Sequence, residues 1–125
     1  MHRSLLARLF AVSLVASASI AFVGCGPSAE DEKLMAEKMD LEVKQAKIWS
    51  DHKNDCKKMH GEFVAFRKEH GGRLKAIDDW WGKLGDGAKD KLIEKHRKEW
   101  DSINLPMVEI VVKCPDEWKD GMKTY

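Results

Sequence analysis

The stretch from Ala29 to His70 constrains the fold most, because it contains no proline and a single glycine. Within it, residues suited to a core recur at steps of three and four, or at multiples of these steps. Such residues share one face of an amphipathic helix. They are Leu34, Leu41, Ile48, His52, Cys56, Met59, Phe63 and Phe66. The pattern predicts one long helix that ends at Gly71-Gly72, with Ser50-Asp51 as the place where it could break.

Two shorter helices are predicted in the second half of the chain. One carries a single apolar stripe and stops at the turn Gly85-Asp86-Gly87. The next begins after this turn and stops at Asn104-Leu105-Pro106, because a proline inside a helix removes a backbone hydrogen bond. The first stripe comprises Leu74, Ile77, Trp81 and Leu84, and the second comprises Ala88, Leu92, His96, Trp100 and Ile103.

The segment from Met107 to Cys114 fits two structures. Its β-branched residues suit a strand, whereas the spacing of its apolar residues also suits a helix opened by Pro106. A lone strand would leave its backbone groups without hydrogen bonds, so a helix is the better prediction. Trp118 is then expected to pack back on the core.

These segments together predict an all-α fold, a small bundle of three to four helices with a long first helix. Ser28 lies three residues before Asp31, which is typical of a capped helix start. The helical domain is therefore expected to span residues 29–119. Residues 120–125 are expected to form a flexible tail.

The first 24 residues have the layout of an export signal. Residues 1–8 include Arg3 and Arg8, and residues 9–24 are uncharged and mostly apolar. This stretch ends in Phe22-Val23-Gly24-Cys25, which resembles the lipobox of bacterial lipoproteins, although leucine is more usual than phenylalanine at its first position.

The resemblance implies that the Cys25 thiol receives a diacylglycerol and that the signal is cleaved before this residue. Residues 25–28 would then form a short tether to a membrane. Gly26 follows Cys25 where an aspartate would signal retention at the inner membrane, so the resemblance favours the periplasmic face of the outer membrane. The alternative is ordinary secretion, with cleavage after Ala16-Ser17-Ala18, an A-x-A site.

The chain contains three cysteines, and an unpaired thiol is a liability in an oxidising compartment. Lipidation of Cys25 would leave Cys56 and Cys114 as one pair. We therefore predict a disulfide between them, which links the first long helix covalently to the last apolar segment. Closing a loop of this length stabilises a fold by about 4 kcal/mol in the loop-entropy account.

The charge balance gives no reason to expect a nucleic acid partner. The whole chain has a formal net charge of +1, and removal of Arg3 and Arg8 with the signal changes this to −1. The positive and negative residues are interleaved, as on the solvated surface of a helical protein.

The histidines indicate an alternative function, in which a small periplasmic helical bundle binds a metal or haem. His52, Cys56 and His60 follow one another at i, i+4 spacing, which can bring such side chains toward one ion. His96 lies on an apolar stripe, where it could be a haem ligand together with His52 or a methionine. Buried or solvated histidines without any ligand are the commoner outcome, so no cofactor is predicted.

The first helix carries a second apolar stripe, nearly opposite Leu34 and Leu41. It contains Met35, Met39 and Val43. Such a stripe either packs inside the bundle or contacts a second copy or another envelope protein. No catalytic motif occurs in the sequence. The expected function is therefore that of a lipid-anchored binding or structural module, not of an enzyme.

Overall fold

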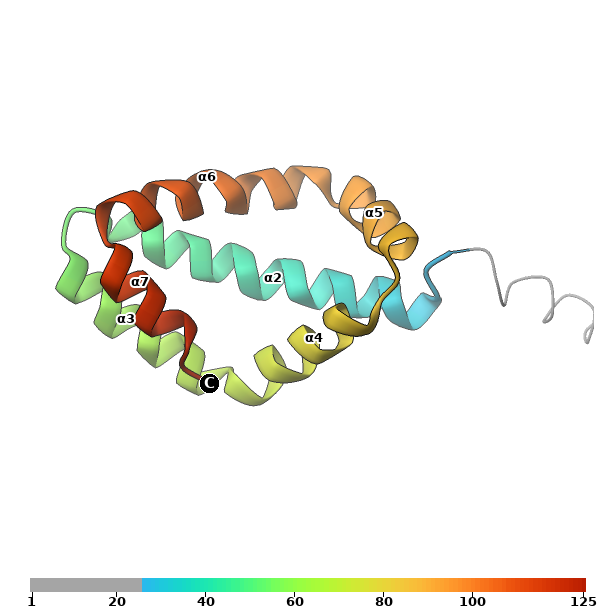
Figure 1. Cartoon of the computed structure of the whole chain (residues 1–125), viewed down its shortest axis with the longest axis horizontal. Coiled ribbons are helices and arrows are strands. Elements are labelled where there is room, and N and C mark those ends of the chain that lie inside the picture. The colour runs from blue at the N-terminus through green and yellow to red at the C-terminus, as the bar shows by residue number, and fades with distance from the viewer. Residues whose placement is uncertain (1–25) are drawn as a thin grey trace, which may run out of the picture.

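The computed structural model describes residues 26–125, and this part of the chain is helical throughout, without a strand. Figure 1 shows its six helices, so the all-α prediction is confirmed and the predicted number of three to four is too small. They are α2 (Ala29–Asp51), α3 (Cys56–Glu69), α4 (Gly71–Lys83), α5 (Asp86–Lys95), α6 (Arg97–Lys113) and α7 (Pro115–Met122). The predicted signal and the lipidation residue Cys25 lie outside the described residues.

The helices form two hairpins joined by a connector. The α2–α3 hairpin lies beside the α6–α7 hairpin, with α2 packed mainly against α6 and α3 mainly against α7 (Figure 1). Helices α4 and α5 connect the two hairpins at the end of the molecule where α2 begins. The disulfide between Cys56 and Cys114 joins the two hairpin turns.

Helix α2 begins as the sequence predicts and ends at Ser50-Asp51, the place where the sequence allowed a break. The Ser28 hydroxyl accepts a hydrogen bond from the Asp31 amide, and the Asp31 carboxylate accepts one from the Ser28 amide. The helix ends at Asp51, and the Asp55 side chain caps α3 by accepting from the Lys58 amide at 3.0 Å. The predicted long helix is therefore two helices, α2 and α3, because polar turn and capping residues interrupt the apolar stripe.

The two glycines after His70 open a helix and do not end one. Helix α3 ends at Glu69, and Gly71 is already the first residue of α4. A Cβ atom on Gly71 would lie 2.5 Å from the carbonyl carbon of Tyr125. Gly71 therefore permits the close approach of the C-terminal backbone to the corner between α3 and α4.

The predicted third helix is divided at His96 into α5 and α6, and α6 continues through Pro106 to Lys113. The expected break at Pro106 is therefore wrong, although the prediction of helix over 107–114 is confirmed. A proline here removes the hydrogen bond to the Ser102 carbonyl. Ser102 is exposed, so water can solvate that carbonyl, and Ile103 and Ile110 on the inner face keep α6 packed.

Residues 120–125, predicted as a flexible tail, include the end of α7 and pack on the other helices. Helix α7 extends to Met122, and Gly121 is buried against the Phe63 ring, where an added Cβ would lie 2.6 Å from Cε2. The Tyr125 hydroxyl donates a hydrogen bond to the Asp78 carboxylate at 2.6 Å. Trp118 does pack on the core, with its ring centroid 6.4 Å from that of Trp49.

Two separate apolar clusters form the core. The larger joins α2 to α3, α5, α6 and the start of α7, and the smaller joins α2 to α4. The larger comprises Met35, Met39, Ala46, Trp49, Met59, Phe63, Leu92, Ile103, Ile110 and Cys114, and the smaller comprises Leu41, Leu74 and Ile77. Both sides of α2 are thus covered, one by α6 and its neighbours and the other by α4.

Candidate binding cavity between α2 and α6

The sector of α2 between its two apolar sides is polar. Lys38, Glu42 and Gln45 follow one another at helical spacing and continue to Trp49. At about 100° per residue they lie between the side that packs on α6 and the side that packs on α4. Lys38 and Gln45 are nevertheless buried, with exposed fractions of 6% and 4%. Inward-facing helix positions are usually apolar, so these buried polar residues depart from the expected pattern and mark this sector as a candidate site.

This polar sector borders a cavity of about 190 Å³. Helix α2 contributes one side of the cavity, α6 a second side and the end of α7 a third. The lining residues are Lys38, Glu42, Gln45 and Trp49 of α2, Trp100, Ile103, Asn104 and Met107 of α6, and Met122 of α7. The cavity therefore has a charged and amide-bearing side along α2, and apolar or aromatic groups with the single amide of Asn104 around the rest.

Lys38 and Glu42 form an ion pair within the cavity lining. The Lys38 ammonium also lies over the ring of Trp81 from α4, 5.3 Å from the ring centroid. Trp81 in turn packs near Trp100 at 6.0 Å between centroids. This arrangement gives the buried cation one carboxylate and one aromatic face, and it links α2 to both neighbouring helices.

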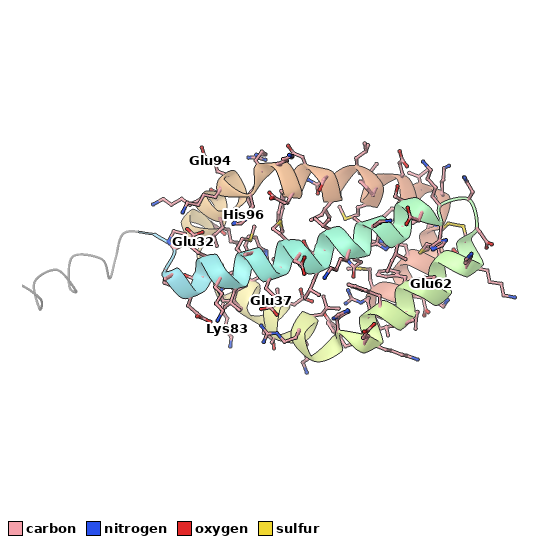
Figure 2. The ribbon with its side chains drawn as sticks, turned by 180° about the vertical axis from the view of Figure 1, so that it is seen from behind. Glu32, Glu37, Glu62, Lys83, Glu94 and His96 are labelled. Atoms are coloured by element: carbon pink, nitrogen blue, oxygen red, sulfur yellow. A yellow bond between two sulfur atoms is a disulfide. The ribbon has the colours of Figure 1, made fainter. Side chains whose placement is uncertain are left out.

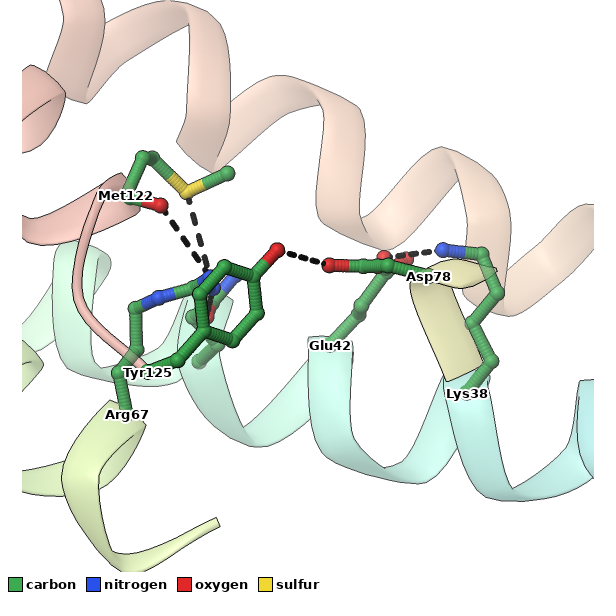
Figure 3. A network of polar contacts seen from close by, with 7 residues as sticks. Lys38, Glu42, Arg67, Asp78, Met122 and Tyr125 are labelled. Carbon is green, nitrogen blue, oxygen red and sulfur yellow. Dashed lines mark hydrogen bonds and ion pairs between the residues drawn. The ribbon is translucent and has the colours of Figure 1, made fainter. Parts of the chain in front are cut away.

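Arg67 of α3 anchors the opposite end of the polar sector (Figure 3). Its guanidinium, which is 3% exposed, donates to the Gln45 side-chain oxygen at 3.0 Å and to the carbonyls of Met122 and Thr124 at 3.2 and 2.7 Å. It also lies 4.8 Å from the ring centroid of Tyr125. Arg67 thus holds the last residues of the chain against the cavity lining.

Two indole N–H groups lack hydrogen-bond partners among the described residues, although both are buried. They belong to Trp49, which lines the cavity, and to Trp118. The Trp49 ring meets that of Phe63 edge to face, with centroids 5.4 Å apart. An unpartnered buried N–H is unusual in a packed core.

The predicted disulfide is confirmed. The Sγ atoms of Cys56 and Cys114 are bonded, with 5.4 Å between the Cα atoms. Cys56 therefore has no thiolate to offer a metal, and the His60 ring nitrogen lies 2.6 Å from an Asp120 carboxylate oxygen. Among residues 26–125, no cluster of three or more histidine, cysteine or acidic side chains could hold a metal ion.

The structure does not bring the haem candidates His52 and His96 together. His52 caps the end of α2, whereas His96 borders a hollow lined by Ala36, Met39 and Val43, nearer the start of this helix. Figure 2 shows His96 in the part of the molecule nearer the start of α2. The two rings would therefore need a large rearrangement to share one iron.

The proposed contact face on α2 is largely internal. Met35 and Met39 are 0% and 2% exposed and belong to the larger core cluster, whereas Val43 is exposed. The first half of α2 does not protrude, because α4, α5 and α6 fold back over it. Exposed apolar side chains lie instead on α6, where they are Leu105, Val108, Val111 and Val112.

A larger hollow of about 570 Å³ lies at the end of the molecule where α2 begins. It is lined by Pro27, Glu32, Lys91, Glu94 and Lys95. The three side chains of α5 among them are exposed, and Lys95 is paired with Glu32 at 2.6 Å. Because this hollow is formed mostly by solvated charged groups, the cavity beside the polar sector of α2 is the better candidate for a binding site.

Comparison with known proteins finds no match to this chain, whether among protein families, curated proteins or solved structures. Between residues 26 and 125, none of the helices combines the length and the apolar character needed to span a bilayer.

Proposed function

We propose that this protein is a lipid-anchored binding module of the bacterial cell envelope, which holds a small molecule in the cavity between α2 and α6. The observation that supports binding most strongly is the polar sector of α2, where Lys38 and Gln45 are buried yet line a cavity. Lys38 is paired with Glu42 and Gln45 with Arg67, so these side chains are held in place beside the cavity. A mostly apolar cavity with a few fixed polar groups is typical of small-molecule sites.

The cysteine arrangement supports the envelope and anchor part of this proposal. The disulfide occupies both cysteines of the described residues, Cys56 and Cys114. Stable disulfides are typical of exported proteins. Cys25 is then the third cysteine of the sequence, and it follows Gly24 at the end of the apolar stretch. Two or three acyl chains on this residue would make membrane attachment effectively permanent.

Mass spectrometry of the membrane fraction tests the anchor. We expect an acylated N-terminal Cys25, and we expect a Cys25→Ser variant to lose both the modification and the cleavage. A variant with Ala16→Leu and Ala18→Leu is the matched control, since it removes the alternative A-x-A site and should still be processed before Cys25. A mature chain that begins at Ser19 with an unmodified Cys25 would contradict the proposal.

Native mass spectrometry of the full chain released from its own membranes tests the binding part. We expect a small molecule to remain bound to the wild-type protein, and to be absent when Ile103 is changed to tryptophan to fill the cavity. Circular dichroism should confirm that this variant remains folded. A wild-type protein that carries no more bound small molecule than the variant would argue against a binding module.

A further inference from the structure

We infer that the cavity takes a small, uncharged amphipathic molecule whose single polar end both donates and accepts hydrogen bonds, as an amide does. The inference rests on the proposed binding function and names the chemical class of the ligand. It follows from three properties of the cavity: the paired charges along α2, the apolar groups opposite them and the volume.

The paired charges determine the polar end of the ligand. Lys38 and Glu42 neutralise each other inside the cavity lining, so an anion or a cation that entered would leave one charge without its partner. The ammonium has three N–H groups and the carboxylate has two oxygens, so the pair retains capacity to donate and to accept. An amide carbonyl can accept from Lys38 while its N–H donates to Glu42.

The remaining groups strengthen this assignment. Gln45 lies one helical turn beyond Glu42, and its oxygen is already used by Arg67 at 3.0 Å, which leaves its amide N–H groups as donors. Asn104 faces the same cavity from α6. These amide and ion-pair groups favour a ligand with neutral polar atoms over a hydrocarbon, because a hydrocarbon would leave their remaining donors and acceptors without hydrogen bonds.

The apolar lining and the volume determine the body of the ligand. Trp100, Ile103, Met107 and Met122 supply aromatic, branched and flexible thioether surfaces. The volume of about 190 Å³ is somewhat larger than that of an engineered protein cavity that accepts benzene. The body is therefore a single ring or a short branched chain, not a fused ring system or a long acyl chain.

Isothermal titration calorimetry on the full processed chain in lipid nanodiscs tests the inference with four probes of similar size. These are phenylacetamide, toluene, phenylacetate and phenethylamine, which share a ring and differ in the polar end. We expect phenylacetamide to bind about tenfold more tightly than each of the others. The inference is overturned if toluene binds as tightly, if either charged probe binds more tightly, or if none binds.

A double variant assigns the preference to the ion pair. Lys38→Met with Glu42→Leu replaces one buried and one half-buried charge by apolar groups of similar size, a change that often preserves stability. We expect this variant to lose the preference for phenylacetamide over toluene while it unfolds at a similar temperature. Asp40→Leu with Lys44→Met is the matched control, since it removes an exposed i, i+4 pair at 3.0 Å on α2 and should keep the preference.

If the preference persists in the Lys38→Met, Glu42→Leu variant, the ligand does not use this pair and the inference fails. A co-purifying molecule that is a metal complex or an anion would overturn the ligand class but leave the binding module intact. The absence of any bound molecule in the native protein would overturn the binding module itself. The failures of the two proposals can therefore be told apart.

Discussion

The two ends of α2 are held by different kinds of contact. Where α2 finishes, a disulfide joins the hairpin turns, Trp49 and Phe63 are buried, and Gly121 allows α7 to approach α3 closely. Where α2 begins, α4 and α5 are held by hydrogen bonds, ion pairs and partly buried tryptophans. Examples are the Arg73–Glu37 bond at 2.6 Å and the hydrogen bond from the Trp80 indole to Asp31 at 2.9 Å.

The difference matters because only the first end is closed by a covalent bond, whereas the second combines apolar contacts of α4 and α5 with exposed polar contacts that are weak singly. The cavity lies between these two regions, with Trp49 toward the first and Lys38 toward the second. We therefore expect the connector of α4 and α5 to open more readily than the paired hairpins.

Removal of the disulfide should have the largest effect on stability. A variant with Cys56→Ser and Cys114→Ser should lose about 4 kcal/mol of unfolding free energy, since the bond closes a loop across both hairpins. Urea denaturation followed by far-ultraviolet circular dichroism measures this loss. A loss below about 1 kcal/mol would show that apolar packing alone holds this end of the molecule.

Gly121→Ala should have the next largest effect. The new methyl group would overlap the Phe63 ring, and overpacking of this kind costs about 1–3 kcal/mol. Gly61→Ala is the matched control, because Gly61 is exposed within α3 and has open space around its Cβ position. The control should stabilise the protein by about 0.5–1 kcal/mol through helix propensity. Equal effects of the two substitutions in thermal melts would contradict the close packing of α7 on α3.

Trp80→Phe should have a smaller effect that depends on pH. The indole N–H of Trp80, followed by the Ser28 amide, holds the pKa of the Asp31 carboxyl below its ordinary value. This contribution is present above about pH 4 and is lost as the pH falls through the folded-state pKa. We expect a loss of at most about 1 kcal/mol at pH 7, because the site is partly solvated.

The pH profile distinguishes this hydrogen bond from simple loss of packing. The unfolding free energy of the wild-type protein should fall more steeply between neutral and acid pH than that of the Trp80→Phe variant. Parallel profiles for the two proteins would mean that Trp80 contributes only packing and that Asp31 is not coupled to folding.

Val112→Lys should have the smallest effect. Val112 is 76% exposed on α6, and surface substitutions of this kind usually change stability by less than about 0.5 kcal/mol. Ile110→Lys, at a fully buried position two residues away, is the contrasting variant and should unfold the protein. A marked loss of stability from Val112→Lys in thermal melts would show that the outer face of α6 is covered in solution.

Much of the local structure could be predicted from the sequence. The helix start at Ser28 follows from its spacing to Asp31, and the disulfide follows from the pairing of the two cysteines after Cys25. The candidate cavity could not be predicted in the same way, although a signal was present. The two apolar stripes of α2 lie on either side of Lys38, Glu42 and Gln45. Helices that pack on both stripes therefore leave these polar side chains facing the gap between those helices.

The sequence by itself determined that the described chain is helical, because apolar spacing and capping residues act over one or two turns. Only the tertiary structure decided how the second half of the chain divides at His96 and Pro106 and which faces are covered. The glycine at position 71 leaves room for the backbone of Tyr125, and Pro106 stays within α6 because Ile103 and Ile110 are held in the core. Met35 and Met39 are internal because segments distant in the sequence pack against them. Such long-range contacts outweigh local helix preferences, which amount to a few kcal/mol.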